Sequence, residues 1–263
     1  MDVRLDGRTA LITGGSLGLG RAMAQRFAEA GAQVAIVARR PEVLDEAAQA
    51  IHAGLGTGSG GVRGYPCDVR DAGQLNAMFK RVVEDLGRVD ILVNNAGTSR
   101  TGKFEDITDE VWQEDLDLKL FSAVRLSRLA LPGMKARRWG RILNVLNTGA
   151  KAPAAGGAPT AVTRAAGMAL TKVLAGEGAP HNVLVNAMLV GLIVSDQWRQ
   201  RHAREQRHPS FEDYARELGK AVPIGRMGQP EEFADLACFL ASDRGSYITG
   251  TAINVDGGRS PVV

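Results

Sequence analysis

The sequence predicts an α/β fold, a doubly wound parallel β-sheet with helices on both faces, in a single domain that spans residues 1–263. Three observations predict this fold class. Apolar segments of strand length alternate along the chain with amphipathic segments of helix length, which is the pattern of a parallel sheet covered by helices. A glycine-rich turn joins the first strand to the first helix. The chain contains neither an internal repeat nor a linker that would divide it.

The glycine-rich turn spans residues 13–20 and has the spacing Gly-x3-Gly-x-Gly. It follows an apolar strand at 9–12 and opens a helix over 21–30, the context that predicts dinucleotide binding. Glycines let the backbone approach a pyrophosphate closely, and the helix N-terminus offers unpaired N–H groups to it. The predicted cofactor-binding residues of this turn are Gly14, Ser16, Leu17, Gly18, Leu19 and Gly20.

The other elements follow in order along the chain. Five further apolar runs predict buried strands at 34–38, 62–66, 89–93, 141–145 and 183–187. Amphipathic segments predict helices at about 42–52, 70–86, 109–138 and 158–178. The glycine-rich run 54–61 has no helix behind it to supply aligned N–H groups, so we expect a flexible surface loop there.

The composition excludes several classes of protein. With 263 residues, 44% of them hydrophobic and 23% charged, the chain can bury a full core without disulfides or metals. A formal net charge of +3 is too small to indicate nucleic-acid binding. Cys67 and Cys238 lie far apart and form no metal-binding spacing, which favours reduced thiols in a cytoplasmic protein. The sequence shows neither a signal peptide nor an apolar run of about 18 residues, so we expect no membrane partner.

Two arginines follow the strand at 34–38, at a position that selects between nicotinamide cofactors. In dinucleotide-binding folds an acidic residue here binds ribose hydroxyls, whereas an arginine suits a 2′-phosphate. Arg39 and Arg40 stand here without an acidic residue beside them. We therefore expect NADP(H) in preference to NAD(H). The alternative is that both arginines are simply solvated at the end of a strand.

A second motif follows the strand at 89–93 and reads Asn94-Asn95-Ala96-Gly97. Its small side chains let a cofactor lie close, and its amides can bond neighbouring backbone groups. Together with the glycine turn, this motif resembles the short-chain dehydrogenase/reductase family. The resemblance covers nearly the whole chain, from residue 6 to 258, and implies a last strand and its terminal turn within 248–258. It implies a Rossmann-like sheet in which Asn95, Ala96 and Gly97 shape the cofactor cleft.

Two shorter segments resemble other cofactor-binding parts of the same family. Asp68 and Val69 match the family's Asp-Val pair beside the adenine, although an aspartate after a strand is also a common helix cap. The segment 190–195 resembles the family's Pro-Gly-x-x-x-Thr, whose backbone and hydroxyl bind the nicotinamide carboxamide. The resemblance implies cofactor contacts from Gly191, Ile193 and Ser195.

The family moves a hydride between a nicotinamide and a carbonyl or alcohol carbon, and the protein itself moves one proton. Its members use a tyrosine as proton donor, with a lysine four residues later that lowers the tyrosine pKa and holds the nicotinamide ribose. A serine bonds the carbonyl oxygen, and an asparagine on a long helix supports a water relay. Aligned by motif, this chain has Lys119 in place of the asparagine, Asn147 of the serine, Thr160 of the tyrosine and Arg164 of the lysine.

These replacements keep polar groups but change the acid–base chemistry. The hydroxyl of Thr160 is a far weaker acid than a phenol, so it could relay a proton but not supply one. Asn147 can still donate an N–H to a carbonyl oxygen, an interaction whose loss costs roughly 10²–10³-fold in rate. Arg164 can hold ribose hydroxyls of the cofactor, but its permanent charge excludes proton transfer.

Lys119 is the replacement that could supply the missing proton. If it faces the cleft near Arg164, repulsion between the two cations and partial burial both lower its pKa. We hypothesise that Lys119 is the proton donor, or that it makes the cleft a site for an anionic ligand. Alternatively, its ammonium reaches solvent or pairs with Asp115 or Asp117.

The segment at about 192–220 is polar and rich in arginine, and by the family resemblance it is an insertion that covers the substrate. Its arginines could reach an anionic small-molecule substrate such as an acyl thioester of coenzyme A, but a solvated helix face is the simpler interpretation. The resemblance also implies a homotetramer, assembled through the two long helices at 109–138 and 158–178.

Two functions remain open from the sequence. The first is an NADP(H)-dependent oxidoreductase that uses a non-standard proton donor on a carbonyl or alcohol substrate. The cofactor motifs and the polar group at each altered position support it. The second is a catalytically silent nucleotide-binding or partner protein, supported by the simultaneous loss of tyrosine and lysine.

Overall fold

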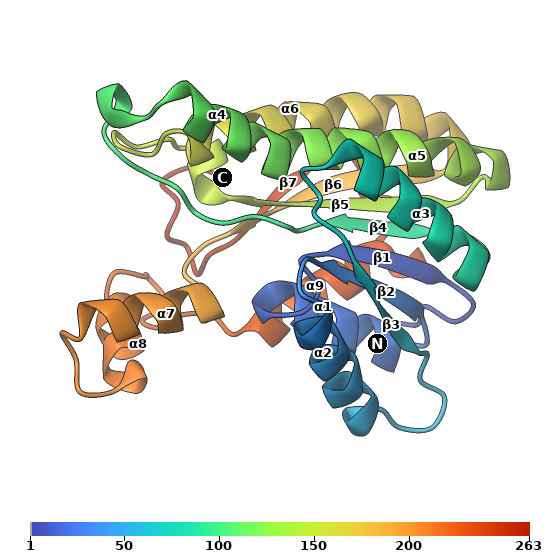
Figure 1. Cartoon of the computed structure of the whole chain (residues 1–263), viewed down its shortest axis with the longest axis horizontal. Helices are drawn as coiled ribbons and strands as arrows, with labels where there is room; N and C mark the ends of the chain where they lie inside the picture. The colour runs from blue at the N-terminus through green and yellow to red at the C-terminus, as the bar shows by residue number, and fades with distance from the viewer. Residues whose placement is uncertain (1) are drawn as a thin grey trace.

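Seven parallel strands form one β-sheet in the computed structural model, which describes residues 2–263. The strands are β1 (Thr9–Thr13), β2 (Gln33–Ala38), β3 (Val62–Pro66), β4 (Ile91–Asn94), β5 (Gly140–Asn147), β6 (Val183–Val190) and β7 (Ala252–Val255). Their order is β3-β2-β1-β4-β5-β6-β7, and every neighbouring pair is parallel. The strand order reverses between β1 and β4, whose carboxyl ends flank the place where such sheets bind ligands. The predicted doubly wound parallel sheet is confirmed (Figure 1).

Helices cover both faces of this sheet (Figure 1). They are α1 (Gly18–Glu29), α2 (Pro41–Gly54), α3 (Ala72–Leu86), α4 (Asp109–Leu116), α5 (Ser122–Arg137), α6 (Thr160–Gly178), α7 (Asp196–Glu205), α8 (Phe211–Gly219) and α9 (Pro230–Ala241). On one face lie α1, α2 and α9, and on the other α3, α5 and α6. The short helices α7 and α8 project beyond the sheet, on the side where its strands have their carboxyl ends.

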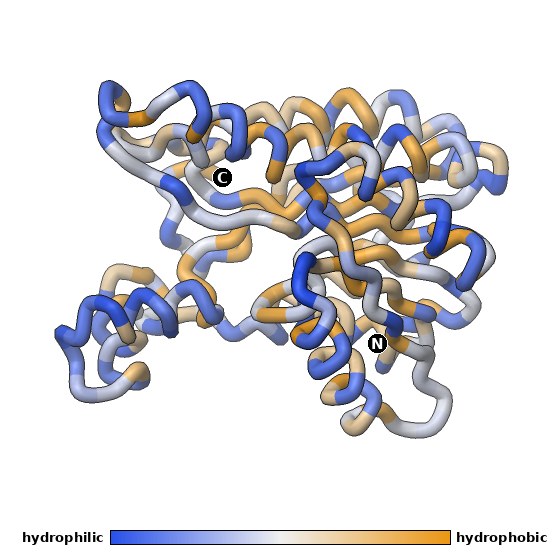
Figure 2. The backbone as a smooth tube through the Cα atoms, in the orientation of Figure 1, coloured by the Kyte–Doolittle hydropathy of each residue, from blue (hydrophilic) through white to orange (hydrophobic). Residues whose placement is uncertain are grey.

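Alternate side chains of the central strands enter two hydrophobic cores. Ala10 and Ile12 of β1 pack into the core that includes residues of α1 and α9, whereas Leu11 between them packs into the core with residues of α3 and α5. A strand buried on both faces needs apolar residues at successive positions, which explains the continuous apolar runs of the sequence. Figure 2 shows the strands mainly in hydrophobic colours and α7 and α8 mainly in hydrophilic ones.

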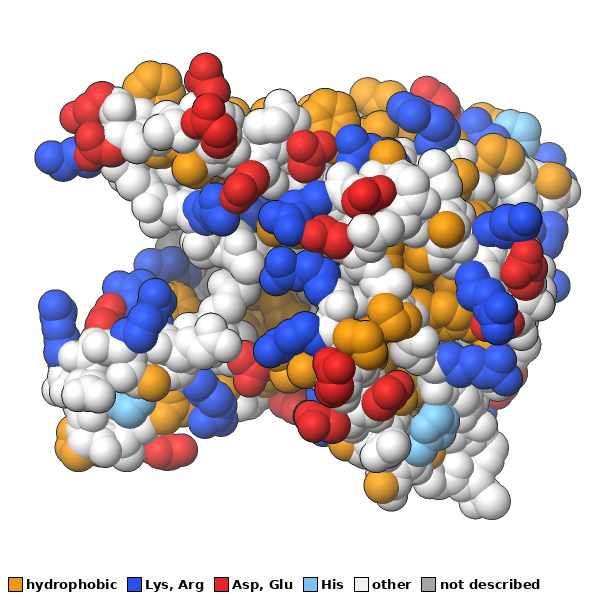
Figure 3. Space-filling model, in the orientation of Figure 1, with side chains coloured by type: hydrophobic (Ala, Val, Ile, Leu, Met, Phe, Trp, Pro, Cys, Tyr) orange, Lys and Arg blue, Asp and Glu red, His pale blue; other side chains and the backbone are white. Residues whose placement is uncertain are grey.

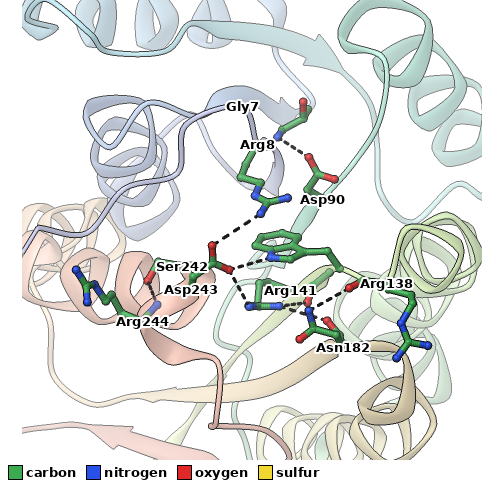
Figure 4. A network of polar contacts seen from close by, with 12 residues as sticks. Gly7, Arg8, Asp90, Arg138, Arg141, Asn182, Ser242, Asp243 and Arg244 are labelled. Atoms are coloured by element: carbon green, nitrogen blue, oxygen red, sulfur yellow. Dashed lines mark hydrogen bonds and ion pairs between the residues drawn. The ribbon is translucent and has the colours of Figure 1, made fainter.

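A polar network closes the amino-terminal end of the sheet, where β1 and β5 begin (Figure 4). The indole of Trp139 lies between two guanidinium groups, with Arg8 Cζ 3.6 Å and Arg141 Cζ 4.3 Å from its ring centroid. Its N–H donates to Asp243 Oδ1 at 2.9 Å. Burial lowers the pKa of Arg141 to about 10. Attraction of both cations to the indole and to Asp243 therefore ties together the starts of two central strands.

The predicted helix at 109–138 is not regular. It consists of α4, a π-helical turn η2 (Asp117–Phe121) and α5, which follow one another directly. A π-helical turn accommodates an extra residue and frequently occurs at functional sites. Lys119 lies in the middle of η2. The sequence has no glycine or proline between 109 and 121 that would have indicated this turn.

The remaining elements agree with the prediction to within a few residues, apart from α9, which is absent from the predicted set. Helix α9 begins with a reciprocal capping box between Gln229 and Glu232, and Pro230 occupies its first turn. Both are start signals that the sequence displays. The segment 192–220 folds into α7 and α8. Within residues 2–263, every helix lacks either the length or the apolar character that a membrane span requires.

Candidate active site

The glycine turn between β1 and α1 is shaped for close contact with a ligand. Gly14 (φ +65°) and Gly18 (φ +53°) adopt the left-handed conformation that favours glycine. A Cβ on Gly20 would collide with the carbonyl oxygen of Gly14, so only glycine lets α1 start this close to the turn. The first turn of α1 has neither a side-chain cap nor an acidic residue, which leaves its N–H groups available to an anion. The turn also holds buried Ser16, exposed Leu17 and half-buried Leu19.

Asn95 fastens the loop after β4 to this glycine turn. Its side-chain amide donates to the carbonyl oxygens of Thr13 at 2.9 Å and Gly14 at 3.2 Å. In return, the Thr13 hydroxyl accepts from the backbone N–H groups of Asn95 and Ala96, both at 3.0 Å. The two motifs, which lie far apart in the sequence, therefore form one surface at the carboxyl ends of β1 and β4.

Arg39 and Arg40 follow β2 and are both exposed. Within the described chain neither forms an ion pair, although the neighbouring Arg70 pairs with Asp68. Hydrogen bonds from Arg70, and to a smaller extent the charge of Arg39, hold the pKa of Asp68 below its ordinary value. The carboxylate of Asp68 is thus engaged by Arg70, and Val69 beside it is buried. Two uncommitted arginines at the end of a strand are suited to a phosphate group.

Lys119 is enclosed by protein. Its side chain is 0% exposed and forms an ion pair with Asp115, one turn earlier, whose side chain is 1% exposed. The Lys119 ammonium also donates to Thr160 Oγ1 at 2.8 Å. Burial, and next the positive charge of Arg164, lower the pKa of Lys119 to about 8, while Asp115 acts in the opposite direction. An ammonium with this pKa changes its charge close to neutral pH.

The hydroxyl of Thr160 uses its hydrogen-bonding capacity within the protein. It accepts from Lys119 and from the backbone N–H of Arg100 at 3.0 Å, and it lies 2.7 Å from the carbonyl oxygen of Arg100. Because a carbonyl oxygen only accepts, the hydroxyl proton of Thr160 is donated to Arg100. A proton relay through Thr160 would therefore end at a backbone carbonyl unless the Arg100 segment moved.

Arg164 and Asn147 border the same site from α6 and β5. Arg164 Nη1 donates to the carbonyl oxygen of Val145 at 2.7 Å, and a Cβ on Gly97 would collide with its guanidinium. Burial lowers the pKa of Arg164 to about 10, so it stays charged at neutral pH. The Asn147 Oδ1 atom is buried, and no residue of the described chain forms a hydrogen bond with it. A buried amide oxygen without a partner is available to a hydrogen-bond donor of a ligand.

The segment after β6 reaches the glycine turn from another side. A Cβ on Gly191 would collide with Asp256, so this glycine permits a close crossing of two chain segments. Ile193 is buried, and the Cβ of Ser195 lies 3.7 Å from the place that a Cβ on Gly18 would occupy. Figure 3 shows a hollow between the lobe of α7 and α8 and the body of the molecule, bordered by Lys and Arg side chains.

The predicted residues thus form two neighbouring groups, one around the glycine turn and one around Lys119. Gly97 belongs to both, since it adjoins Arg164 and lies close to Lys119. Sequence reasoning placed Asp115 only among the possible ion-pair partners, although its i, i+4 spacing from Lys119 is a usable signal. It did not identify Arg100, whose contribution to Thr160 comes from backbone atoms that any residue possesses.

Comparisons with known proteins identify relatives of this chain. A family model described as enoyl-(acyl carrier protein) reductase matches residues 14–260. The oxidoreductase UcpA of Escherichia coli K12 is 37% identical over 263 residues, covering 98% of this chain and 96% of that protein. The 3-oxoacyl-[acyl-carrier-protein] reductase FabG of Vibrio cholerae is 36% identical over 256 residues, covering 97% and 98%.

Solved structures have the same fold. The L-sorbose reductase of Gluconobacter frateurii, complexed with NADPH and L-sorbose, matches with a TM-score of 0.93 at 35% identity over 100% of both chains. An NADPH-bound short-chain oxidoreductase of Pseudomonas aeruginosa PAO1, which contains an atypical catalytic center, matches with a TM-score of 0.90 at 37% identity over 99% of both chains. On the family model and these relatives of full length, the chain belongs to the short-chain dehydrogenase/reductase family.

Proposed function

We propose that this protein is an NADP(H)-dependent oxidoreductase that transfers a hydride between the nicotinamide and a carbonyl or alcohol carbon of a small molecule, with Lys119 as the proton donor. The observation that carries this proposal is the enclosed Lys119 ammonium, whose pKa of about 8 lies close to neutral, beside the loop of Gly97. A group that titrates near the working pH is suited to general acid–base catalysis. Membership of the family supports the reaction class.

The residues present fit a nicotinamide dinucleotide phosphate. The uncapped start of α1 would hold the pyrophosphate, and the unpaired Arg39 and Arg40 would hold a 2′-phosphate. The NADPH bound to two solved relatives supports the same cofactor here. When bound, it supplies or accepts the hydride. We propose further contacts along the whole cofactor. Asp68 and Val69 would lie beside the adenine, and Asn95, Ala96 and Gly97 would line the cofactor cleft. Arg164 would hold the nicotinamide ribose, and Gly191, Ile193 and Ser195 would contact the carboxamide.

We also propose that Lys119, Asn147, Thr160 and Arg164 replace the family's asparagine, serine, tyrosine and lysine. Thr160 is committed to Arg100 and Arg164 keeps its charge, so Lys119 is the one of the four that can exchange a proton near neutral pH. In carbonyl reduction the Lys119 ammonium gives one proton to the oxygen while the carbon receives the hydride, which leaves a neutral amine and an alcohol. Alcohol oxidation reverses both transfers.

Two further features of the site support this chemistry. The side-chain N–H of Asn147 can donate to the same oxygen and stabilise the negative charge that develops there, and its buried Oδ1 has no hydrogen-bond partner among residues 2–263. Because Lys119 is enclosed, the Arg100 segment that covers it through Thr160 must move aside, or the ammonium must swing out, when a substrate binds. Until this movement takes place, the enclosure keeps water away from the ammonium.

A catalytically silent nucleotide-binding protein is the less favoured alternative. It accounts for the committed hydroxyl of Thr160. It does not account for the enclosed pair of a lysine and an aspartate. Burying two charges has a desolvation cost, and a protein without catalytic activity has no functional need for such a pair.

The segment 192–220 would cover a small-molecule substrate beside the hollow (Figure 3). Its arginines are partly committed, since Arg201 pairs with Glu205 and the Arg199 guanidinium lies 4.3 Å from the ring centroid of Phe211. These contacts favour a solvated helix face over a dedicated site for an anionic substrate.

The proposed assembly is a homotetramer through α4, α5 and α6, as in other family members. Phe121, Val162 and Val173, which lie on this helical layer, are exposed apolar side chains. Their burial against a second copy would remove apolar surface from water.

A reducing compartment such as the cytoplasm suits the two cysteines. Cys67 and Cys238 are free and buried, and burial raises the pKa of each thiol to about 11. Buried thiols of this kind are unreactive and need no disulfide partner.

Binding calorimetry with NADPH and with NADH tests the cofactor proposal. We expect NADPH to bind tightly and NADH much more weakly. The double substitution Arg39→Ala and Arg40→Ala should weaken NADPH binding about 10–100-fold, since charge-assisted hydrogen bonds are lost, and should leave NADH unchanged. Arg128→Ala, an exposed arginine on α5, is the matched control. Equal affinity for both cofactors would overturn the NADP(H) preference, and binding of neither would overturn the oxidoreductase proposal.

A further inference from the structure

The ion pair of Asp115 and Lys119 is almost completely enclosed, with side-chain exposures of 1% and 0%. Asp115 lies in the last turn of α4 and Lys119 lies one turn later in η2, so the two side chains share one face of a continuous helical path. Enclosing two charges carries a desolvation penalty that their attraction does not always offset. A pair in this position therefore calls for a reason other than stability.

The other groups whose charges act on Lys119 are positive, and one of them, Arg100, is itself paired with Glu114 at 2.6 Å. Arg164 approaches from α6 and Arg100 from the loop after β4, and the charge of each disfavours the protonated form of Lys119. Burial acts in the same direction and is the largest cause. The Thr160 hydroxyl accepts one N–H of the ammonium but brings no charge. Among residues 2–263, Asp115 is thus the one acidic group paired with this ammonium.

Among residues 2–263, the carboxylate of Asp115 forms no hydrogen bond other than the one with Lys119. Its Oδ1 atom bonds the Lys119 ammonium, and its Oδ2 atom is buried with no hydrogen-bond partner in the described chain. Within the described residues, the Asp115 side chain therefore forms its hydrogen bond with Lys119 alone.

We propose that Asp115 is a positioning residue that keeps the Lys119 ammonium protonated and holds it toward Thr160, at the place from which the proton is given to the substrate. The inference rests on the proposed function of Lys119. Without the carboxylate, the ammonium keeps a low-dielectric surrounding and two neighbouring cations, of which Arg100 is paired with Glu114, and it loses its proton at neutral pH. Carbonyl reduction then lacks its acid although every group that contacts the substrate is intact.

The test is the pH profile of kcat for NADPH-dependent carbonyl reduction, measured for the whole protein with Asp115→Asn. We expect the alkaline limb to move to lower pH by at least about one unit, so that kcat falls about tenfold or more at neutral pH and recovers on acidification. Asp117→Asn is the matched control, because Asp117 pairs with Arg125 and not with Lys119, and its profile should stay in place. Asp115→Glu, which keeps the charge, should restore most of the wild-type profile.

Lys119→Met separates this inference from the proposed function. If Lys119 is the donor, this variant should lose about 10²–10⁴-fold in kcat, and acidification should not rescue it. An inactive Lys119→Met together with an unshifted Asp115→Asn profile would overturn the role of Asp115 and leave the donor intact. A fully active Lys119→Met would overturn the donor.

A direct titration of the Lys119 side-chain nitrogen by ¹⁵N NMR tests the inference independently of activity. The inference requires Lys119 to be protonated at neutral pH in the wild-type protein and to titrate at lower pH in Asp115→Asn. An ammonium that is already neutral at pH 7 in the wild type would overturn it, even if the asparagine variant failed to fold.

Discussion

The Lys119 ammonium donates to Thr160 Oγ1 at 2.8 Å, and this hydrogen bond joins the π-helical turn after α4 to the first turn of α6. The same hydroxyl bonds both the N–H and the carbonyl oxygen of Arg100. One threonine therefore holds together three segments that are distant in the sequence. The enclosure of Lys119, on which its lowered pKa depends, follows from this junction.

Replacing Thr160 by valine should lower the free energy of unfolding by about 2–4 kcal/mol. The substitution keeps the shape of the side chain but leaves buried donors and an acceptor of Lys119 and Arg100 without a partner. Chemical denaturation measures the change. Thr160→Ser, which keeps the hydroxyl, should remain within about 1 kcal/mol of the wild type. Equal stability of the valine and serine variants would show that the hydroxyl is not a junction.

Restoring the family's tyrosine and lysine, by Thr160→Tyr with Arg164→Lys, should give no large gain in the reduction of simple carbonyls. Thr160 is 3% exposed, so a phenol in its place would displace the Arg100 segment and disturb Lys119 rather than enter a prepared cleft. Steady-state kinetics with NADPH, compared with the wild type and with Arg164→Lys alone, measure the effect. A gain of about 10²-fold or more would instead favour a silent relative of the enzymes.

The fold follows from the sequence because the central strands of its sheet are buried on both faces. A run such as 89–93 is apolar at nearly every position, which few structures other than a central parallel strand can accommodate. The glycine turn adds a steric requirement that the structure shows directly, since Gly20 and the carbonyl of Gly14 leave no room for a Cβ. The irregularity at 117–121 could not be predicted, because no glycine or proline marks it.

The site follows from the sequence only in part. Alignment by motif identified Lys119, and its ion pair with Asp115 was named among the alternatives, together with a pair with Asp117. The enclosure of the pair depends on Thr160 and Arg100, which other segments bring to it. Arg100 acts there through its backbone, so its residue type carries no signal. The hydrogen bond that Thr160 donates to the Arg100 carbonyl oxygen is likewise a property of the folded chain alone.

Gly20→Ala should abolish cofactor binding and lower the free energy of unfolding by about 2 kcal/mol or more. Its Cβ would meet the Gly14 carbonyl and the Asn95 amide, which together fasten the two cofactor loops, and such overpacking has costs of this size. The control is Gly56→Ala in the loop after α2, where a Cβ would meet nothing within 4 Å. Its stability and NADPH affinity should match the wild type. If both alanine variants bound NADPH normally, α1 would not need to approach the turn so closely.

The lowered pKa of Lys119 predicts how stability changes in alkaline solution. Between about 8, its pKa in the folded protein, and its ordinary value of 10.5, the unfolded chain binds a proton that the folded protein does not. Raising the pH through this window therefore stabilises the folded state, by up to about 3 kcal/mol, and below it the contribution is constant. This contribution is absent in Lys119→Met.

Denaturation of both proteins across this window checks the sign. The wild type should gain stability relative to Lys119→Met as the pH rises, whereas its difference from Lys172→Met, which alters an exposed lysine of α6, should stay constant. A relative loss of stability in the same window would mean that the folded protein raises the pKa of Lys119. The attraction of Asp115 would then outweigh burial and the charges of Arg164 and Arg100, and Lys119 would hold its proton too tightly to serve as a donor near neutral pH.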